Sequence, residues 1–123
     1  MIGIGTDLVD IDRFRDALAR TPGMRRRLFT AAEQTYADQA VDPAPRLAAR
    51  FAAKEATLKA LGLGLGGMPM AEIEVIRHSD GRPELVLHGE AGEIAAEHGA
   101  GRWLVTLTHT DTVAQATVVA LAS

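Results

Sequence analysis

The sequence predicts an α+β fold in which a mainly antiparallel sheet carries helices packed on one face. The first observation behind this class is the order of the expected elements: one strand, several helices, two strands, one helix and two final strands. The second is that each later pair of strands is joined by a short turn, which favours antiparallel pairing. The third is that 123 residues without a repeat, linker or low-complexity tract fit one domain over residues 1–123.

The first half of the chain contains one strand and then helices. The strand lies in "GIGTDLVDID", residues 3–12, where the side chains alternate. Asp10 is placed to cap a helix through "IDRFRDALAR", which ends before the helix-breaking "TPG". A short basic helical piece follows. Thr30 and Glu33 then have the spacing of a capping box, which begins a helix that ends before "VDPAP".

The second half begins with the longest helix, from Pro45 to Leu61, with proline at its start and Gly62 after its end. The glycine-rich "GLGLGG" is a loop. Beyond it, "AEIEVIRHSDGRPELVLHG" predicts a hairpin that turns at Asp80-Gly81, and "EAGEIAAEHGA" predicts a short helix. The strands "RWLVTLTH" and "TVAQATVVALA" follow, and we expect them to pair antiparallel.

Composition narrows the class of protein. Hydrophobic residues make up 47% of the chain but aromatic residues only 4%, so the core consists mostly of Ala, Val, Leu and Ile, and oligomerisation would add to its stability. The absence of cysteine excludes disulfides and thiolate metal sites. No segment resembles a signal peptide or a membrane span, so we expect a cytoplasmic location. The net charge of −3 gives no general basis for binding nucleic acid.

Positive charge is nevertheless concentrated in one segment, "RFRDALARTPGMRRR", residues 13–27. It contains six arginines and a single acidic residue, Asp16. A patch of this kind on an acidic protein indicates an acidic partner. The alternative is that these arginines form the solvated face of a surface helix.

The longest helix carries charged residues beside an apolar stripe. At about 100° per residue, large apolar side chains share one stripe and alanines form the opposite flank. Lys54 falls within the stripe, Glu55 lies at its margin and Lys59 is one turn further on. One interpretation is an ordinary Glu55–Lys59 pair, with Lys54 extending its ammonium group to solvent.

Asp7 favours a different interpretation. Asp7 lies near the end of an apolar strand, and a helix packed against that strand would bring Glu55 close to it. Mg²⁺ usually binds one or two carboxylates of a protein and keeps its other coordination positions for water and substrate phosphate. Gly3 and Gly5 lie on the same side of the strand as Asp7 and leave room for something other than a side chain. The alternative is that Asp7 only caps backbone amides at a turn.

Two further motifs are less specific. His109 ends a strand in "VTLTHTD". One interpretation is that its ring binds a phosphate, and the other is that it only stabilises the strand end. "GLGLGG" follows a helix and not a strand, which excludes a P-loop or a Rossmann fingerprint. The loop either binds a phosphate, for which its glycines are a weak signal, or is a flexible end of the helix.

Three motifs together resemble holo-acyl-carrier-protein synthase, the small bacterial class of 4′-phosphopantetheinyl transferase. They are "GIGTDLVDIDRF", "RFAAKEATLKALGLGLG" and "VTLTHTDTVAQATVV", and their order and spacing match across the whole chain. The resemblance implies transfer of 4′-phosphopantetheine from coenzyme A to a serine hydroxyl of an acidic acyl carrier protein, with release of adenosine 3′,5′-bisphosphate. It also implies a homotrimer with active sites at subunit contacts.

By position, the resemblance implies a role for particular residues. Asp7 and Glu55 would hold Mg²⁺, Lys59 would bind a phosphate, and the serine proton would go to Glu55 or to a metal-bound water. Coenzyme A would be bound by cationic and hydroxyl side chains and by the glycine-rich loop: Arg46, Arg50, Lys54, Gly62, Gly64, Gly66, His109 and Thr110. The carrier protein would dock on arginines of the N-terminal segment: Arg13, extended by Arg20 and by Arg25, Arg26 and Arg27.

Two other functions fit the same residues. One is an Mg²⁺-dependent hydrolase of a coenzyme A or nucleotide pyrophosphate, with Asp7 and Glu55 at the metal and water as the nucleophile. The other is a non-catalytic module in which the arginine segment binds an acidic protein and the carboxylates only cap or pair. The resemblance favours the transferase over both.

Overall fold

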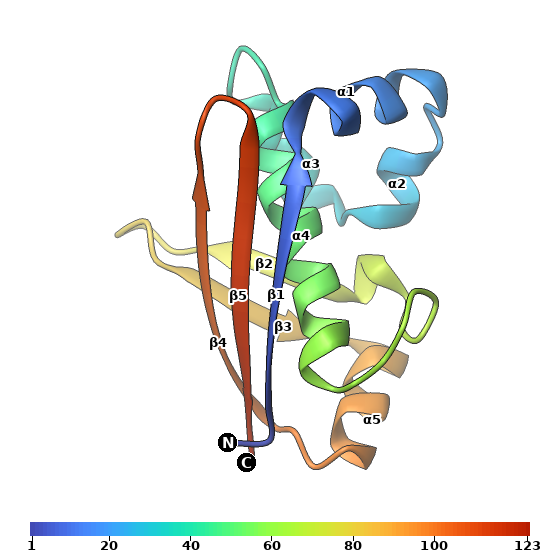
Figure 1. The fold of residues 1–123 in the computed structure, drawn as a ribbon, viewed down its shortest axis with the longest axis vertical. Helices are drawn as coiled ribbons and strands as arrows, with labels where there is room; N and C mark the ends of the chain where they lie inside the picture. The colour runs from blue at the N-terminus through green and yellow to red at the C-terminus, as the bar shows by residue number, and fades with distance from the viewer.

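Five strands and five α-helices confirm the predicted α+β class (Figure 1). The computed structural model describes all residues, 1–123. In chain order the elements are β1 (Gly3–Asp10), α1 (Ile11–Arg20), α2 (Met24–Leu28), α3 (Ala31–Asp38), α4 (Ala44–Ala60), the short 3-10 helix η1 (Met70–Glu72), β2 (Ile73–Arg77), β3 (Pro83–Leu87), α5 (Gly89–Glu97), β4 (Arg102–His109) and β5 (Val113–Leu121).

The strands form two sheets. β1, β5 and β4 make a three-stranded sheet in that order, and both neighbouring pairs run antiparallel. β2 and β3 form a separate antiparallel hairpin that passes behind this sheet (Figure 1). The two predicted antiparallel pairs are therefore confirmed, but the division into two sheets is a feature that the strand pattern did not predict. Pairing of the first strand with the last brings the two ends of the chain side by side.

α4 packs across one face of the three-stranded sheet, mainly against β1 and β5. The alanine flank of the helix and two glycines of β1 explain how closely the backbones approach. A Cβ atom at Gly3 would overlap the carbonyl oxygen of Ala60, and one at Gly5 would overlap that of Ala56. The interpretation that these glycines leave room for a ligand is therefore wrong, because the backbone of α4 fills that space.

The predicted helix ends are confirmed by their hydrogen bonds. At the start of α1, the Asp10 carboxylate accepts a backbone N–H at 2.9 Å. Thr30 and Glu33 form the capping box of α3, in which each side chain accepts the backbone N–H of the other residue. After α4, Gly62 takes a φ of 72°, and the next N–H returns to a carbonyl of the last helical turn.

Small side chains dominate the core, as the composition predicts: 14 of its 25 buried hydrophobic residues are alanines. Three rings provide the large contacts. Phe14 stacks on Phe51 with ring centroids 5.1 Å apart and meets Phe29 edge-on at 6.2 Å, which joins α1 to α4. None of the helices has the length and apolar character that a bilayer crossing requires.

The other face of the three-stranded sheet is uncovered (Figure 1). Large apolar side chains point outward from its strands, with Ile4 58%, Leu8 69% and Leu104 59% exposed. Val119 on the central strand lies in register between Ile4 and Leu104. We call these four residues the outer sheet face. Large exposed apolar side chains on an uncovered sheet face indicate a contact surface.

Candidate active site

Asp7 lies on the side of β1 that faces α4. The Lys59 ammonium donates hydrogen bonds to the Asp7 carboxylate at 2.8 Å and to the Thr6 carbonyl oxygen at 3.1 Å. The side chain of Asp7 is 17% exposed and that of Lys59 is 53% exposed. The first strand and the long helix therefore meet at Asp7, at an edge of their interface that is open to solvent.

Glu55 lies one turn before Lys59 on α4. Its pKa is raised, first by burial and then by the negative charge of Asp7, while Lys59 opposes the rise. Asp7 and Glu55 are thus close enough for their charges to repel each other. A divalent cation held between two carboxylates relieves such repulsion, so this pair fits Mg²⁺.

The carboxylate pair would provide only part of a metal coordination sphere. No group of three or more His, Cys, Asp or Glu side chains is arranged to hold a metal ion. Mg²⁺ usually binds one or two carboxylates together with waters and substrate phosphates. Asp7 and Glu55 match that pattern, because they leave coordination positions for phosphate oxygens.

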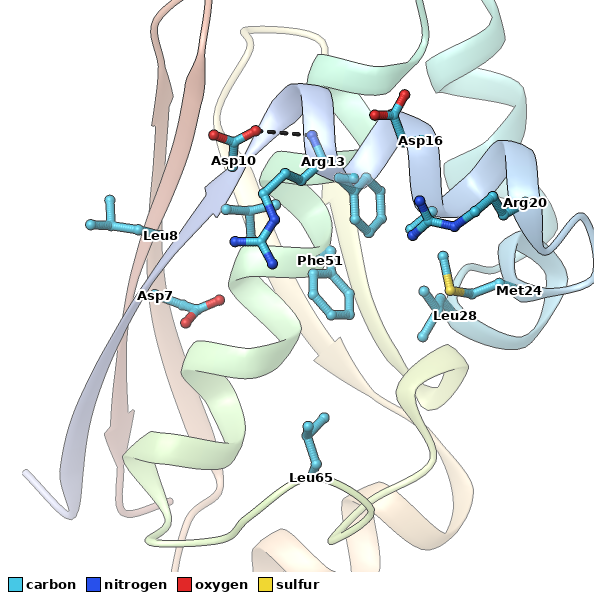
Figure 2. A pocket seen from close by; sticks show the side chains of 13 residues that line it. Asp7, Leu8, Asp10, Arg13, Asp16, Arg20, Met24, Leu28, Phe51 and Leu65 are labelled. Carbon is cyan, nitrogen blue, oxygen red and sulfur yellow. Dashed lines mark hydrogen bonds between the residues drawn. The ribbon is translucent and has the colours of Figure 1, made fainter.

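A cavity of about 560 Å³ opens beside Asp7, between β1, α1, α2 and α4 (Figure 2). Figure 2 shows Asp7 and Arg13 pointing toward the same space, from β1 and α1 respectively. Most of the lining side chains are apolar, among them Phe14, Met24, Leu28, Phe51 and Leu65. Apolar walls with a few charged groups at the edge are typical of a ligand site.

The predicted carrier-binding arginines divide into two groups. Arg13 and Arg20 are exposed and line the cavity beside Asp7. Arg25 instead packs back against α3 and pairs with Asp38 at 2.6 Å. Its predicted place on the docking surface is therefore not supported, because its charge already has a carboxylate partner. The two arginines that follow it are exposed on α2.

A second cavity, of about 330 Å³, brings together Arg46, Arg50 and His109, three of the residues predicted to bind coenzyme A. We call it the arginine cavity. The His109 Nδ1–H donates to the Thr110 carbonyl oxygen at 3.2 Å, which leaves Nε2 for other partners. Thr110 does not line this cavity. Its hydroxyl oxygen accepts two backbone N–H groups within the β4–β5 turn.

Lys54 lies at neither cavity. Its side chain is 0% exposed. Its ammonium donates to the Glu33 carboxylate at 2.9 Å, to the Met70 carbonyl at 3.0 Å and to the Ile73 carbonyl. All three N–H groups are therefore used within the fold. The predicted contact of Lys54 with coenzyme A is wrong, and so is the alternative in which its ammonium extends to solvent.

The glycine-rich loop follows the C-terminal end of α4, beyond Lys59. Gly62 and Gly66 have φ values of 72° and 86°, where a residue with a side chain is strained. A Cβ atom at Gly62, Gly64 or Gly66 would meet no other atom within 4 Å, so the space beside each is open. The contact of this loop with coenzyme A stays a prediction.

Tyr36 on α3 and Arg77 at the end of β2 also line the arginine cavity, and neither was predicted from the sequence to bind coenzyme A. Tyr36 follows Glu33 by three residues, a spacing that places both on one face of the helix. Arg77 follows the buried Val75 by two residues along β2, a spacing that places both side chains on one face of the strand. Each signal gives a direction for the side chain, but neither identifies a binding residue.

Comparisons with known proteins agree over nearly the whole chain. A sequence model of the 4′-phosphopantetheinyl transferase superfamily matches residues 3–117. The holo-[acyl-carrier-protein] synthase of Frankia casuarinae is 47% identical over 120 residues, which cover 98% of this chain and 97% of that protein. The crystal structure of holo-[acyl-carrier-protein] synthase from Neisseria meningitidis is 31% identical, with a TM-score of 0.88 and 98% of both chains covered.

The structure of a holo-(acyl-carrier-protein) synthase from Bacillus anthracis, in complex with CoA (3′,5′-ADP), is 28% identical, with a TM-score of 0.82 and with 99% of this chain and 97% of that chain covered. Identity of this extent along the sequence, together with the shared fold, identifies the family. The chain belongs to the 4′-phosphopantetheinyl transferase superfamily and, within it, to the holo-[acyl-carrier-protein] synthase enzymes.

Proposed function

We propose that this chain transfers 4′-phosphopantetheine from coenzyme A to a serine hydroxyl of an apo-acyl carrier protein, uses Mg²⁺ held by Asp7 and Glu55, and releases adenosine 3′,5′-bisphosphate. Membership of the synthase family supports the transfer itself. The observation that carries the finer proposal is the contact of Asp7 with Lys59 at 2.8 Å, one helical turn from Glu55 and beside a cavity edged by Arg13.

The residues around Asp7 have distinct parts in this transfer. The serine oxygen attacks the phosphorus that carries pantetheine, and the pyrophosphate bond on the adenosine side breaks. Asp7 and Glu55 would hold Mg²⁺, which would supply positive charge to the phosphate oxygens. The Lys59 ammonium provides positive charge for the phosphate that leaves. The serine proton would go to Glu55 or to a water bound at the metal.

The arginine cavity suits the nucleotide end of coenzyme A. Arg46, Arg50 and His109 contribute donors and positive charge, and the phosphate groups of the donor are anionic. The Bacillus anthracis relative in complex with CoA (3′,5′-ADP) supports a nucleotide site in this fold. We therefore assign the nucleotide phosphates to this cavity.

A homotrimer with active sites between subunits is part of the proposal. Asp7 is on β1 and His109 is on β4, so the two cavities lie at opposite edges of the three-stranded sheet. A second copy packed against the outer sheet face would bring the arginine cavity of one subunit toward Asp7 of its neighbour. It would also bury the apolar side chains that one chain leaves exposed.

Leu104→Glu is expected to dissociate the assembly at micromolar concentration and to lower activity at least about tenfold, because an unpaired charge buried in an interface costs several kcal/mol. Size-exclusion chromatography with light scattering measures the mass. Val41→Glu adds the same charge to a fully exposed loop residue and is the matched control. A Leu104→Glu protein of unchanged trimeric mass, or a monomer with full activity, would contradict the proposed assembly.

Arg13→Gln is expected to raise the KM for the carrier protein roughly five- to tenfold at low salt, with kcat little changed, because Arg13 attracts an acidic partner at the cavity edge. The difference from wild type should shrink as salt is added. Arg15→Gln is the matched control, since Arg15 lies on the same helix but is held by Asp12 and Asp42. Equal effects of the two variants on this KM would count against a docking role for Arg13.

Intact-mass spectrometry of an apo-acyl carrier protein tests the proposed function. The carrier is incubated with this protein and coenzyme A, in Mg²⁺ or in EDTA. We expect a gain of one phosphopantetheinyl group per carrier in Mg²⁺ and none in EDTA. Cleaved coenzyme A beside an unmodified carrier would favour the hydrolase, and an unmodified carrier with intact coenzyme A would overturn the transfer.

A further inference from the structure

Three arginine side chains gather around one aromatic ring in the arginine cavity. The guanidinium carbons of Arg46 and Arg50, on α4, lie 4.2 and 4.4 Å from the centroid of the Tyr36 ring on α3. The guanidinium carbon of Arg77, at the end of β2, lies 5.5 Å from the same centroid. All three distances are within the range of cation–π attraction. Arg46 also donates to the Tyr36 carbonyl oxygen at 2.8 Å.

None of these three arginines is paired with a carboxylate. The ion pairs of the chain involve other cations, such as Arg15 and Arg25, each held by aspartate. Glu33 on α3 attracts Arg50 through its charge but is itself bonded to Lys54. The three guanidinium groups therefore keep a net positive charge in one cavity, where they also repel one another.

Arg50 provides a second, independent indication of an anion site. The residue is only 5% exposed, and its Nε–H has no hydrogen-bond partner. Its one side-chain hydrogen bond, to the Arg46 carbonyl oxygen, is long at 3.4 Å. Burial also lowers the pKa of Arg50. A buried guanidinium with an unpaired N–H is costly unless a ligand completes its hydrogen bonds.

We propose that Tyr36 is the positioning residue of the arginine cavity and that Arg77 is its third anion-binding guanidinium, so that together they set the preference for a donor carrying a phosphate monoester. This inference rests on the proposed function, in which coenzyme A is the donor. The 3′-phosphate of coenzyme A is such a monoester and carries a charge of about −1.5 to −2 at neutral pH. A cluster of three unneutralised guanidinium groups matches that charge better than it matches a singly charged phosphate.

A tyrosine ring attracts cations without neutralising them, which explains its value at this position. A carboxylate there would pair with the guanidinium groups and compete with the phosphate. The ring keeps Arg46, Arg50 and Arg77 together and leaves their N–H groups for the ligand. If the ring is removed, the like charges separate, while the residues around Asp7 in the other cavity are unaffected.

Calorimetry with adenosine 3′,5′-bisphosphate and steady-state kinetics with coenzyme A test this inference. Tyr36→Leu and Arg77→Gln are each expected to weaken bisphosphate binding, and to raise the KM for coenzyme A, about tenfold with kcat nearly unchanged. Tyr36→Phe retains the ring and should stay close to wild type in both measurements. With dephospho-coenzyme A, which lacks the monoester, the variants and the wild type should have similar KM values.

The outcomes separate this inference from the proposed function. Arg77 is exposed, so Arg77→Gln keeps the test valid even if Tyr36→Leu fails to fold. Equal bisphosphate affinity in wild type and Arg77→Gln, or an equal loss in Tyr36→Phe and Tyr36→Leu, would overturn the inference while carrier modification stays intact. A wild-type protein that binds the bisphosphate but modifies no carrier would overturn the proposed function. In that case, the expected order of bisphosphate affinities among the variants would still support the roles of Tyr36 and Arg77 in the arginine cavity.

Discussion

Asp7→Asn and Glu55→Gln are each expected to slow carrier modification by at least about a hundredfold. Each change removes one of the two carboxylates proposed to hold Mg²⁺ and leaves both cavities in place. Time courses of intact mass at saturating coenzyme A and carrier give kcat. Glu97→Gln, at an exposed position of α5, is the matched control and should keep the wild-type rate.

The substitution at Glu55 is also expected to stabilise the metal-free protein. Burial and the charge of Asp7 raise the pKa of Glu55, so the folded chain binds this proton more tightly than the unfolded chain does. The contribution of this group to stability therefore grows as pH falls through the raised pKa and is lost above it. Glu55→Gln removes the ionised carboxylate, so its melting temperature in EDTA at neutral pH should exceed that of wild type.

Added Mg²⁺ distinguishes a metal site from ordinary charge repulsion. Mg²⁺ is expected to raise the melting temperature of the wild-type protein and to leave that of Asp7→Asn and Glu55→Gln nearly unchanged. Functional sites often contain groups that reduce the stability of the protein until a ligand binds, and this carboxylate pair is expected to behave in that way. No response of the wild type to Mg²⁺, or a Glu55→Gln protein with the full rate, would show that the carboxylates have another role.

Sequence patterns predicted the parts of the site that depend on a single element. Strand alternation singled out Asp7, and helical spacing placed Glu55 and Lys59 within one turn of each other. Capping chemistry identified the starts of α1 and α3, because a cap involves only neighbouring residues. These features follow from the local backbone, so they need no knowledge of how the elements pack.

Contacts between distant segments decided the features that sequence analysis missed or assigned wrongly. Helical periodicity placed Lys54 in the apolar stripe but does not say that η1, β2 and Glu33 close over it. The same limit applies to Gly5, whose missing side chain admits a helix and not a ligand. Tyr36 and Arg77 become neighbours only when α3 and the hairpin pack beside α4.

Lys54→Met is expected to lower the free energy of unfolding by about 3–5 kcal/mol, because it leaves Glu33 as a buried carboxylate without its cation. Both side chains are 0% exposed, so water cannot replace the lost partner. Two backbone carbonyls, of Met70 and Ile73, lose their donor as well. Denaturant unfolding followed by circular dichroism measures the change.

Lys59→Met is the matched control, since it removes a cation from the same helix. The side chain of Lys59 is about half exposed, so its pair with Asp7 should contribute less than about 1 kcal/mol to stability. The activity of the two variants should show the opposite order. Lys59→Met should slow the transfer with little loss of stability, whereas Lys54→Met should lose stability and keep the wild-type KM for coenzyme A in its folded fraction.

The double variant Glu33→Leu/Lys54→Met separates the cost of an unpaired charge from the cost of unpaired backbone groups. Replacing a buried ion pair with apolar residues is often neutral when only the two charges depend on each other. Here Glu33 also accepts the Val75 N–H at 2.9 Å, and Lys54 also donates to two carbonyls, so the double variant should recover only part of the loss. Full recovery would show that those backbone groups find other partners. A Lys54→Met protein with wild-type stability and a raised KM would instead restore the coenzyme A contact predicted from the sequence.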